Sequence, residues 1–257
     1  MQDNILANKR SSFFMTDGRK ITQELDELGF TIIDDVYTDA EVDQLLNTIN
    51  ATPVNGATFR KTKDLFAIRQ FLKEVPDAEG LIFNHRLTGV IQQLFGSGFF
   101  VTKSIYFDKP AQSNWFVAYH QDLTISVDQK TEIDGYGPWT VKQNQFAVQP
   151  PVKVLENSFT IRIHLDDTDQ NNGALKVVPG SNLKGIYRPE TINWQTETET
   201  ICNVKKGGIM IMRPLLLHTS NRSTNQQPRR VIHIEFSNSE LPPTIKWSEK
   251  HQYTQHE

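Results

Sequence analysis

The sequence Val-Ala-Tyr-His-Gln-Asp-Leu at 117–123 places a histidine and an aspartate two residues apart in an apolar run. On an extended strand, side chains two residues apart leave by the same face, so His120 and Asp122 would point together and Gln121 would point away. An imidazole and a carboxylate on one face, joined by a second histidine, form the facial triad that binds non-heme Fe(II). A His-x-Asp pair is also common as a structural contact, so the pair alone leaves both interpretations open.

Composition describes an ordinary globular chain of 257 residues, with 37% hydrophobic and 22% charged residues, a length that fits one large domain. A net charge of -3 and the lack of a basic block give no reason to expect a nucleic-acid partner. No apolar run reaches about 18 residues, so no membrane span is expected. The single cysteine, Cys202, excludes an internal disulfide. The N-terminal sequence lacks the apolar stretch of a secretory signal, so we expect a cytoplasmic protein.

The first 98 residues are predicted to be mainly helical. Gly29 suits the left-handed residue that ends a helix. Thr38 and Glu41 have the spacing of a capping box, which would start a second helix. We expect helices over 16–28, from 39 onward and over 84–95, with a short strand over 29–36.

From residue 99 the sequence favours strands, which are rich in Val, Ile, Phe and Thr and separated by Gly, Pro, Asn and Asp. We expect strands over 99–107, 115–122, 158–166, 174–178, 208–217 and 229–236. Helices followed by many strands predict an α+β fold, mainly β, with the helices packed on an antiparallel sheet or barrel. The interruption at 124–157 is long enough for a lid or binding loop, although its aromatic residues, Tyr136 and Trp139 among them, would equally form a satellite core. Residues 241–257 are expected to be a tail.

A third metal ligand is offered by His218, which ends an apolar run before a polar turn. Eleven residues later, period-2 alternation puts Arg229, His233 and Glu235 on one face of a strand and an apolar set on the other. If the apolar face packs under the helices, Arg229 becomes an interior guanidinium that needs an anion, either a protein carboxylate or a ligand.

The strand over 158–166 has the same two-faced character, with Thr160, Arg162, His164 and Asp166 on its polar face. Its His164-Leu165-Asp166 is a second His-x-Asp. Spacing does not choose between the two pairs.

An ordered set of motifs resembles the phytanoyl-CoA dioxygenase family. The set spans about half of the chain, from residue 109 to residue 236, and its members are specific in combination. They are His120-Gln121-Asp122, Leu165-Asp166-Asp167 with the following Asn-Asn-Gly-Ala-Leu-Lys-Val-Val-Pro-Gly-Ser (171–181), His218-x-Ser220, and Arg229.

The resemblance implies a double-stranded β-helix (jelly-roll, cupin-like) core over 99–240, covered by N-terminal helices, in a single oxygenase domain over 1–257. It implies an oxidoreductase that uses Fe(II), 2-oxoglutarate and O₂ to hydroxylate a small molecule, with succinate and CO₂ as co-products. Its iron ligands would be His120, Asp122 and His218. The cosubstrate would be bound by Arg229, Ser220, Gln121 and Thr160.

Two departures from the family pattern bear on these roles. Arg162 stands where relatives often carry Trp, and it is a candidate anchor for an anionic substrate, beside Tyr136, Trp139, Arg60 and Arg69. The turn before Arg229 is altered, which makes Arg230 a rival for the cosubstrate.

Two other classes of function are compatible with the residues alone. One is a metal-dependent cupin-like enzyme that does not use 2-oxoglutarate. The other is a non-catalytic jelly roll that binds a small molecule. An interior arginine favours the oxygenase, since a 2-oxo diacid has a distal carboxylate to be bound.

Overall fold

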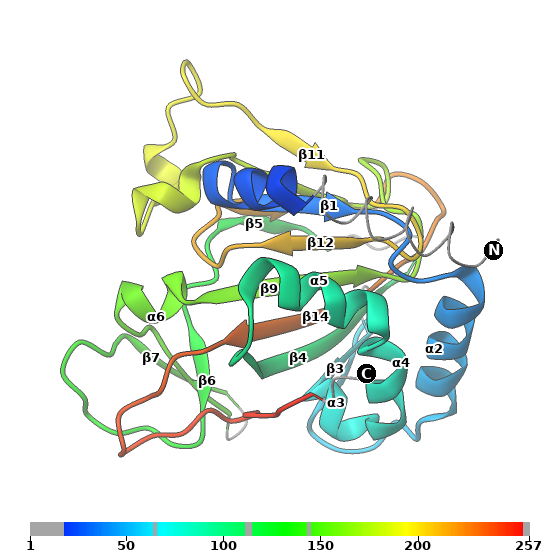
Figure 1. The fold of residues 1–257 in the computed structure, drawn as a ribbon, viewed down its shortest axis with the longest axis horizontal. Coiled ribbons are helices and arrows are strands. Elements are labelled where there is room, and N and C mark those ends of the chain that lie inside the picture. Colours follow the sequence, from blue (N-terminus) through cyan, green and yellow to red (C-terminus); the bar gives the residue numbers. More distant parts are fainter. Residues whose placement is uncertain (1–17, 64–65, 111–114, 143–144, 254–257) are drawn as a thin grey trace, which may run out of the picture.

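The computed structural model describes residues 18–63, 66–110, 115–142 and 145–253, and it contains three antiparallel sheets (Figure 1). The large sheet has the order β1 (Phe30–Ile33), β12 (Ile209–Met212), β9 (Ser158–His164), β14 (Arg229–Ser237), β4 (Phe100–Lys109), β3 (Phe66–Arg69), β2 (Phe59–Lys61). The second has the order β11 (Thr200–Cys202), β10 (Leu175–Val177), β13 (His218–Ser220), β5 (Val117–His120). The third has the order β6 (Ile125–Val127), β8 (Gln145–Val148), β7 (Trp139–Lys142).

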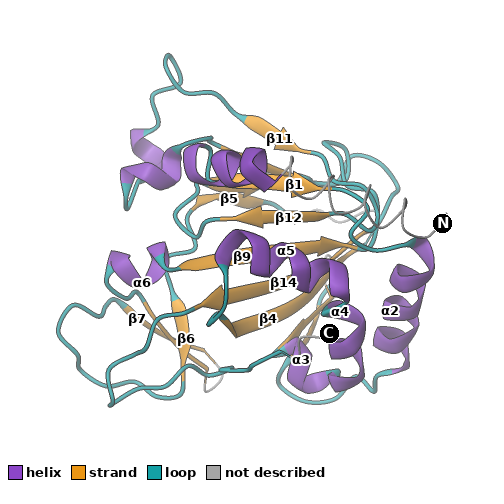
Figure 2. Ribbon diagram, viewed as in Figure 1, coloured by secondary structure: helices purple, strands orange, loops and turns teal. Residues whose placement is uncertain are grey.

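The helices lie mostly against one face of the large sheet, where α5 crosses the strands (Figure 2). A helical segment covers 18–27. The other helices are α2 (Asp39–Ala51), α3 (Phe71–Glu74), α4 (Glu79–Ile82), α5 (His85–Phe95) and α6 (Val152–Glu156), with 3₁₀ turns η1 (Pro76–Ala78), η2 (Ser181–Lys184) and η3 (Pro189–Thr191).

The predicted helix signals are confirmed. Thr38 and Glu41 form a complete capping box at the start of α2. Asn84 caps α5 by accepting hydrogen bonds from the backbone amides of Arg86 and Leu87 at 3.1 and 2.9 Å. Gly29 has φ 83°, which only glycine adopts readily, and it separates the first helical segment from β1.

The alternation predicted for β9 and β14 places the main core. Phe159, Ile161 and Ile163 are fully buried with Ile232 and Ile234 among residues of α2, α4 and α5. The opposite faces of β9 and β14 therefore turn toward the second sheet, and they carry the polar side chains. A separate apolar cluster, which includes Met210, Met212, Val177 and Leu216, lies between the two sheets.

The strands differ from the expectation in several places. The expected strand over 208–217 ends at Met212, and a turn containing Pro214 precedes β13. The expected strand over 29–36 is present as the shorter β1, and the N-terminal part adds two strands that were not expected, β2 and β3; all three extend the large sheet. The 124–157 insertion is a third sheet whose aromatic side chains pack on their own cluster with Trp247 and Ile245, so residues of the expected tail are buried. No helix in the described ranges has the length and apolarity to cross a bilayer.

The capping box predicts a local stability effect. Thr38→Ala removes the acceptor for the Glu41 amide and should lower the free energy of unfolding by about 1 kcal/mol in urea titrations. Thr48→Ala is the matched control, since the Thr48 hydroxyl only bonds back to the carbonyl of Gln44 within α2. An equal loss in both variants would show that the cap contributes nothing specific.

Candidate active site

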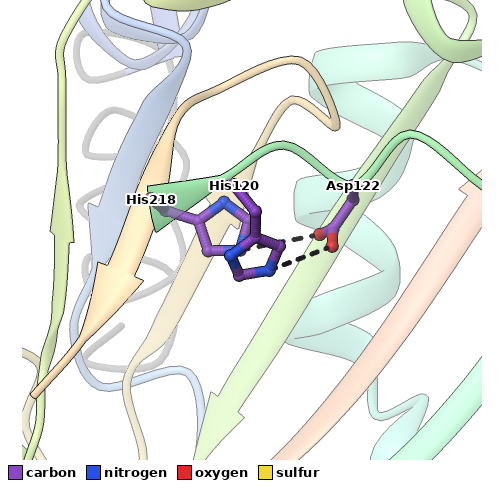
Figure 3. Close-up of side chains that lie close together, drawn as sticks. All are labelled: His120, Asp122 and His218. Carbon is purple, nitrogen blue, oxygen red and sulfur yellow. Dashed lines mark ion pairs between the residues drawn. The ribbon is translucent and has the colours of Figure 1, made fainter. Parts of the chain in front are cut away.

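The two histidines of the candidate metal site face each other across neighbouring strands. His218 on β13 is the direct register partner of His120 on β5. Their rings lie with centroids 4.2 Å apart, and Figure 3 shows both rings turned toward Asp122. The antiparallel pairing thus brings together residues that are far apart in the sequence.

Asp122 reaches the histidines from beyond the end of β5. The prediction that it shares an extended strand with His120 is wrong, because β5 ends at His120. The backbone amide of Asp122 instead donates to the carbonyl of Pro214 at 2.9 Å, which attaches this segment to the turn before β13. Its carboxylate oxygens lie 3.8 Å from Nε2 of His120 and 3.9 Å from Nε2 of His218.

Each ring presents a free nitrogen to this point. Nδ1 of His120 lies 2.9 Å from the carbonyl of Ala118, and Nδ1 of His218 lies 3.0 Å from the carbonyl of Leu216. A carbonyl only accepts, so both Nδ1 atoms carry the proton and both Nε2 lone pairs are available to a metal.

The charge states also suit a cation. Burial lowers the pKa of His218 to about 4, so this imidazole is neutral at pH 7. Burial alone would raise the pKa of Asp122, but the nearby His218, His233 and Lys103 outweigh it and lower this pKa to about 2. His218 thus offers a neutral nitrogen and Asp122 a carboxylate.

The donor atoms of the three residues all lie within 4.8 Å of one another, the one such group found in the described ranges. Metal bonds of about 2.1 Å require donors about 3 to 3.5 Å apart, so small side-chain shifts close the set around one ion. Oδ2 of Asp122 is buried without a hydrogen-bond partner, which such an ion would supply. The side chain of His120 is 41% exposed and that of His218 only 6%, so the site opens to solvent on the His120 side.

Beside the metal site lies a group of interior cations. Arg229 donates from Nη1 to the carbonyl of Gly173, and its buried Nε has no partner. Lys109, only 2% exposed, donates to the carbonyl of Asn221 at 2.6 Å. Burial lowers the pKa of Arg229 to about 9, with Arg162 adding to the effect, and lowers that of Lys109 to about 7, with Arg229 adding to it. In the described part of the chain no carboxylate forms an ion pair with either side chain, so the geometry calls for an anionic ligand.

Ser220 belongs to the same end of the interior. Its hydroxyl donates to the carbonyl of Gly173 at 3.0 Å, the carbonyl that Arg229 also contacts. A Cβ on Gly173 would lie 2.8 Å from Nζ of Lys109 and 3.4 Å from Oγ of Ser220, which shows how closely these donors gather. Sequence reasoning missed Lys109. Spacing along the chain held no signal for it, because Lys109 lies opposite Arg229 only through the pairing of β4 with β14.

Arg162 occupies the interior rather than an outer substrate pocket. It is 7% exposed and donates from Nη1 toward Nδ1 of His233 at 3.0 Å, while its Nε has no partner in the described residues. It is close enough to Asp122 and to Arg229 to affect both electrostatically. An anion at Arg162 would therefore share the space between the metal site and Arg229. Nε2 of His233 in turn lies 3.1 Å from Oε1 of Glu235.

The rivalry between Arg229 and Arg230 is decided by what each contacts. Arg230 donates from Nε and Nη2 to the two carboxylate oxygens of Asp166, at 2.9 and 2.6 Å. Asp166 is the aspartate of the second His-x-Asp pair, so this ion pair engages its carboxylate. The histidine of that pair, His164, has its Nδ1 2.8 Å from Oγ1 of Thr168. Arg230 is neutralised by the protein, and Arg229 is not.

Two proposed cosubstrate ligands have different surroundings. The Gln121 amide donates to the carbonyl of Gly185 at 2.8 Å and accepts from the backbone amide of Tyr187 at 2.9 Å, so it points away from His120 and holds the 181–187 segment. Its partners are backbone groups, which leaves no free donor for a cosubstrate. Oγ1 of Thr160, in contrast, is buried without a partner and borders a small hollow that Asp122 also lines.

Tyr136 and Trp139 pack, half-buried, on the cluster beneath the third sheet, which is the satellite-core alternative. Beside them the insertion forms one wall of a larger cavity of about 540 Å³, opposite β3 and β4. Arg69 lines this cavity, and Arg60 lies instead over the ring of Trp115 at 5.8 Å. Glu249 also lines it, and its carboxylate accepts from the amide and hydroxyl of Ser104 at 3.0 and 2.7 Å.

Comparison with known proteins gives the family. The model of the phytanoyl-CoA dioxygenase family matches residues 25–231, and the chain belongs to that family. No curated protein matches the chain in a sequence search.

Solved structures resemble the fold at low identity. The non-heme α-ketoglutarate-dependent epimerase SnoN from nogalamycin biosynthesis is 13% identical, with a TM-score of 0.65, covering 87% of this chain and 84% of that chain. EctD from S. alaskensis, solved with 2-oxoglutarate and 5-hydroxyectoine, is 17% identical, with a TM-score of 0.65, covering 84% and 74%. The carbocyclase SnoK from nogalamycin biosynthesis is 14% identical, with a TM-score of 0.60, covering 90% and 86%.

Glu249 predicts a pH-dependent stability. Burial raises its pKa to about 7, above the 4.5 of an exposed glutamate, so the folded chain keeps a proton that the unfolded chain has lost. Its contribution to stability therefore falls as pH rises from 4.5 to 7 and is constant above that window. Glu249→Gln keeps the acceptor for Ser104 and should leave stability unchanged at pH 4 but raise it on the order of 2 kcal/mol at pH 8.

The measurement is urea unfolding of both proteins across this pH range. Glu240→Gln, at an exposed residue that pairs with Lys250, is the matched control and should change little. A difference between Glu249→Gln and the native chain that does not vary with pH would contradict the assignment.

Proposed function

We propose that this protein is an Fe(II)- and 2-oxoglutarate-dependent oxygenase that hydroxylates a small molecule, with succinate and CO₂ as co-products. His120, Asp122 and His218 bind the iron. Arg229, Lys109 and Ser220 bind the distal carboxylate of 2-oxoglutarate. The observation that carries the proposal is the pairing of a two-histidine, one-carboxylate site with interior cations that lack a protein anion.

The described residues fit this ligand set without rearrangement of the backbone. Three ligands on one side of an ion leave positions for a bidentate 2-oxo acid and for O₂. Iron and 2-oxoglutarate bound here would react with O₂, which would oxidise 2-oxoglutarate to succinate and CO₂ with one oxygen atom and provide the other for insertion into a C–H bond. A cupin-like enzyme without 2-oxoglutarate would have no use for Arg229 and Lys109, which favours the oxygenase.

The chain's own residues orient the reaction. The Nδ1 bonds of both histidines hold their tautomers and ring directions. Thr160 and Arg162 offer unpaired polar atoms, Thr160 at the hollow that Asp122 also lines and Arg162 near Asp122 and Arg229, so both are candidates for further contacts to the cosubstrate. The side chain of Gln121 holds the 181–187 segment in place, so Gln121 is a positioning residue.

The arrangement of the strands supports a jelly-roll core within one domain over 1–257. The chain passes repeatedly between the two sheets from β9 to β14, with β9, β12 and β14 in the large sheet and β10, β11 and β13 in the second. Helices α2, α4 and α5 cover the outer face, as the main core cluster indicates.

Metal and cosubstrate binding have a direct optical test. Anaerobic addition of Fe(II) and 2-oxoglutarate should give a weak visible charge-transfer band, and His218→Ala should abolish it. His164→Ala is the matched control, since His164 is the histidine of the other His-x-Asp pair, and its band should persist. A native protein that binds no metal and shows no band would refute the proposal and favour a non-catalytic binding protein.

Variants of Arg229 and Arg230 distinguish an effect on cosubstrate binding from an effect on stability. Arg229→Gln should weaken 2-oxoglutarate binding at least about 100-fold, because a charged pair to a carboxylate in an enclosed site is lost. Arg230→Gln, which breaks the pair with Asp166, should lower stability but change that affinity by less than about threefold. Titration of the charge-transfer band with 2-oxoglutarate measures both, and the reverse order would assign the cosubstrate to Arg230.

A further inference from the structure

The cavity of about 540 Å³ lies between the inner face of the large sheet and the third sheet. Its volume is in the range of small-molecule sites. Arg69 and Ile105 line it from β3 and β4, and Gln145 and Phe146 line it from β8. The C-terminal segment closes it with Trp247.

This cavity adjoins the metal site. Thr124 and Trp247 line both the cavity and the small hollow that contains Asp122 and Thr160. Lys103, which also lines the cavity, forms an ion pair with Glu235, and Glu235 lines the small hollow. The cavity therefore shares its walls with the hollow at Asp122.

Two of the charged side chains that line the cavity have partners within the protein. Lys103 forms an ion pair with Glu235 at 2.8 Å, and Glu249 is bonded to Ser104. Lys246 and Asp128 are exposed residues of the lining. Arg69 has only the neutral Oε1 of Gln145, at the long distance of 3.4 Å, and within the described ranges no carboxylate forms an ion pair with it.

We propose that this cavity binds the substrate and that the substrate is a monocarboxylic acid, with its carboxylate on Arg69 and an apolar body against Ile105, Phe146 and Trp247. The substrate role rests on the proposed function. A planar guanidinium matches a carboxylate through two parallel hydrogen bonds.

The residue that binds the anionic substrate is then Arg69, in place of Arg162, the candidate from the sequence. Arg162 lies among the interior cations near Arg229, whereas Arg69 lies at the cavity beside the metal site. The two arginines then select different anions, and cosubstrate and substrate bind without competing. The insertion at 124–157 acquires a role as the wall that faces Arg69 and supplies Gln145.

The test measures binding to metal-free protein, with hexanoate, benzoate and phenylacetate as probes and their primary amides as neutral counterparts. We expect at least one acid to bind at millimolar concentration or below in calorimetric or NMR titration, and its amide to bind at least about tenfold more weakly. Arg69→Gln should weaken that acid about tenfold, and Arg69→Lys should recover part of the affinity. Arg188→Gln, at an exposed residue before η3, removes the same charge elsewhere and should leave the affinity unchanged.

Several results would overturn the inference. They are no binding of any of the three acids, equal binding of acid and amide, and equal affinity in the native and Arg69→Gln proteins. Loss of acid binding in Arg229→Gln but not in Arg69→Gln would also do so, since the probe would then lie in the cosubstrate site.

The charge-transfer band separates this inference from the proposed function. Arg69→Gln should keep the band with Fe(II) and 2-oxoglutarate, which also shows that the variant is folded. Arg69-dependent acid binding in a protein without a band would leave the carboxylate site standing and refute the oxygenase. A band together with acid binding that Arg69→Gln leaves unchanged would support the oxygenase and refute the carboxylate site at Arg69.

Discussion

The two-faced character of β9 and β14 is the constraint on which the rest of the structure depends. Their apolar residues, such as Ile161 and Ile234, are fully buried beneath the helices. Because side chains alternate along a strand, the intervening residues must then face the interior between the sheets. Arg162, Arg229 and Glu235 are charged groups brought into that interior by the packing of their neighbours. The hydrophobic core and the charged site are therefore two consequences of one alternating pattern.

Charges placed inside a protein must be neutralised, and this chain does so in two ways. Lys103 with Glu235 and Arg230 with Asp166 form pairs within the protein. Among the residues that the structure describes, the partners of Arg229 and Lys109 are backbone carbonyls, and burial lowers the pKa of both. An unpaired interior cation is costly, so its retention next to a metal-ligand set is understandable if an anionic ligand completes it.

The metal site likewise depends on both strands and turns. Pairing of β5 with β13 sets the distance between the two imidazoles, and backbone carbonyls set their tautomers. Asp122 comes from the irregular segment after β5, which the carbonyl of Pro214 holds in place. Rigid sheet geometry thus supports two ligands, and a tethered segment supplies the third next to the cavity formed by the insertion. Solved structures at 13–17% identity share this fold, so the framework by itself does not determine the substrate.

The sequence by itself determined the elements whose signals are local. The capping box at Thr38, the cap at Asn84, the helix end at Gly29 and the alternation of β9 and β14 depend on neighbours within a few residues, and the structure has all of them. The ordered motifs also sufficed for the family, which its model confirms over 25–231. Only the tertiary structure decided which of two adjacent arginines is unpaired, since the choice depends on Asp166 from another strand. It also decided how Asp122 reaches the histidines, and it brought Lys109 beside Arg229 and opened the cavity at Arg69. These are contacts between segments distant in sequence, and spacing along one chain carries no information about which distant groups will meet.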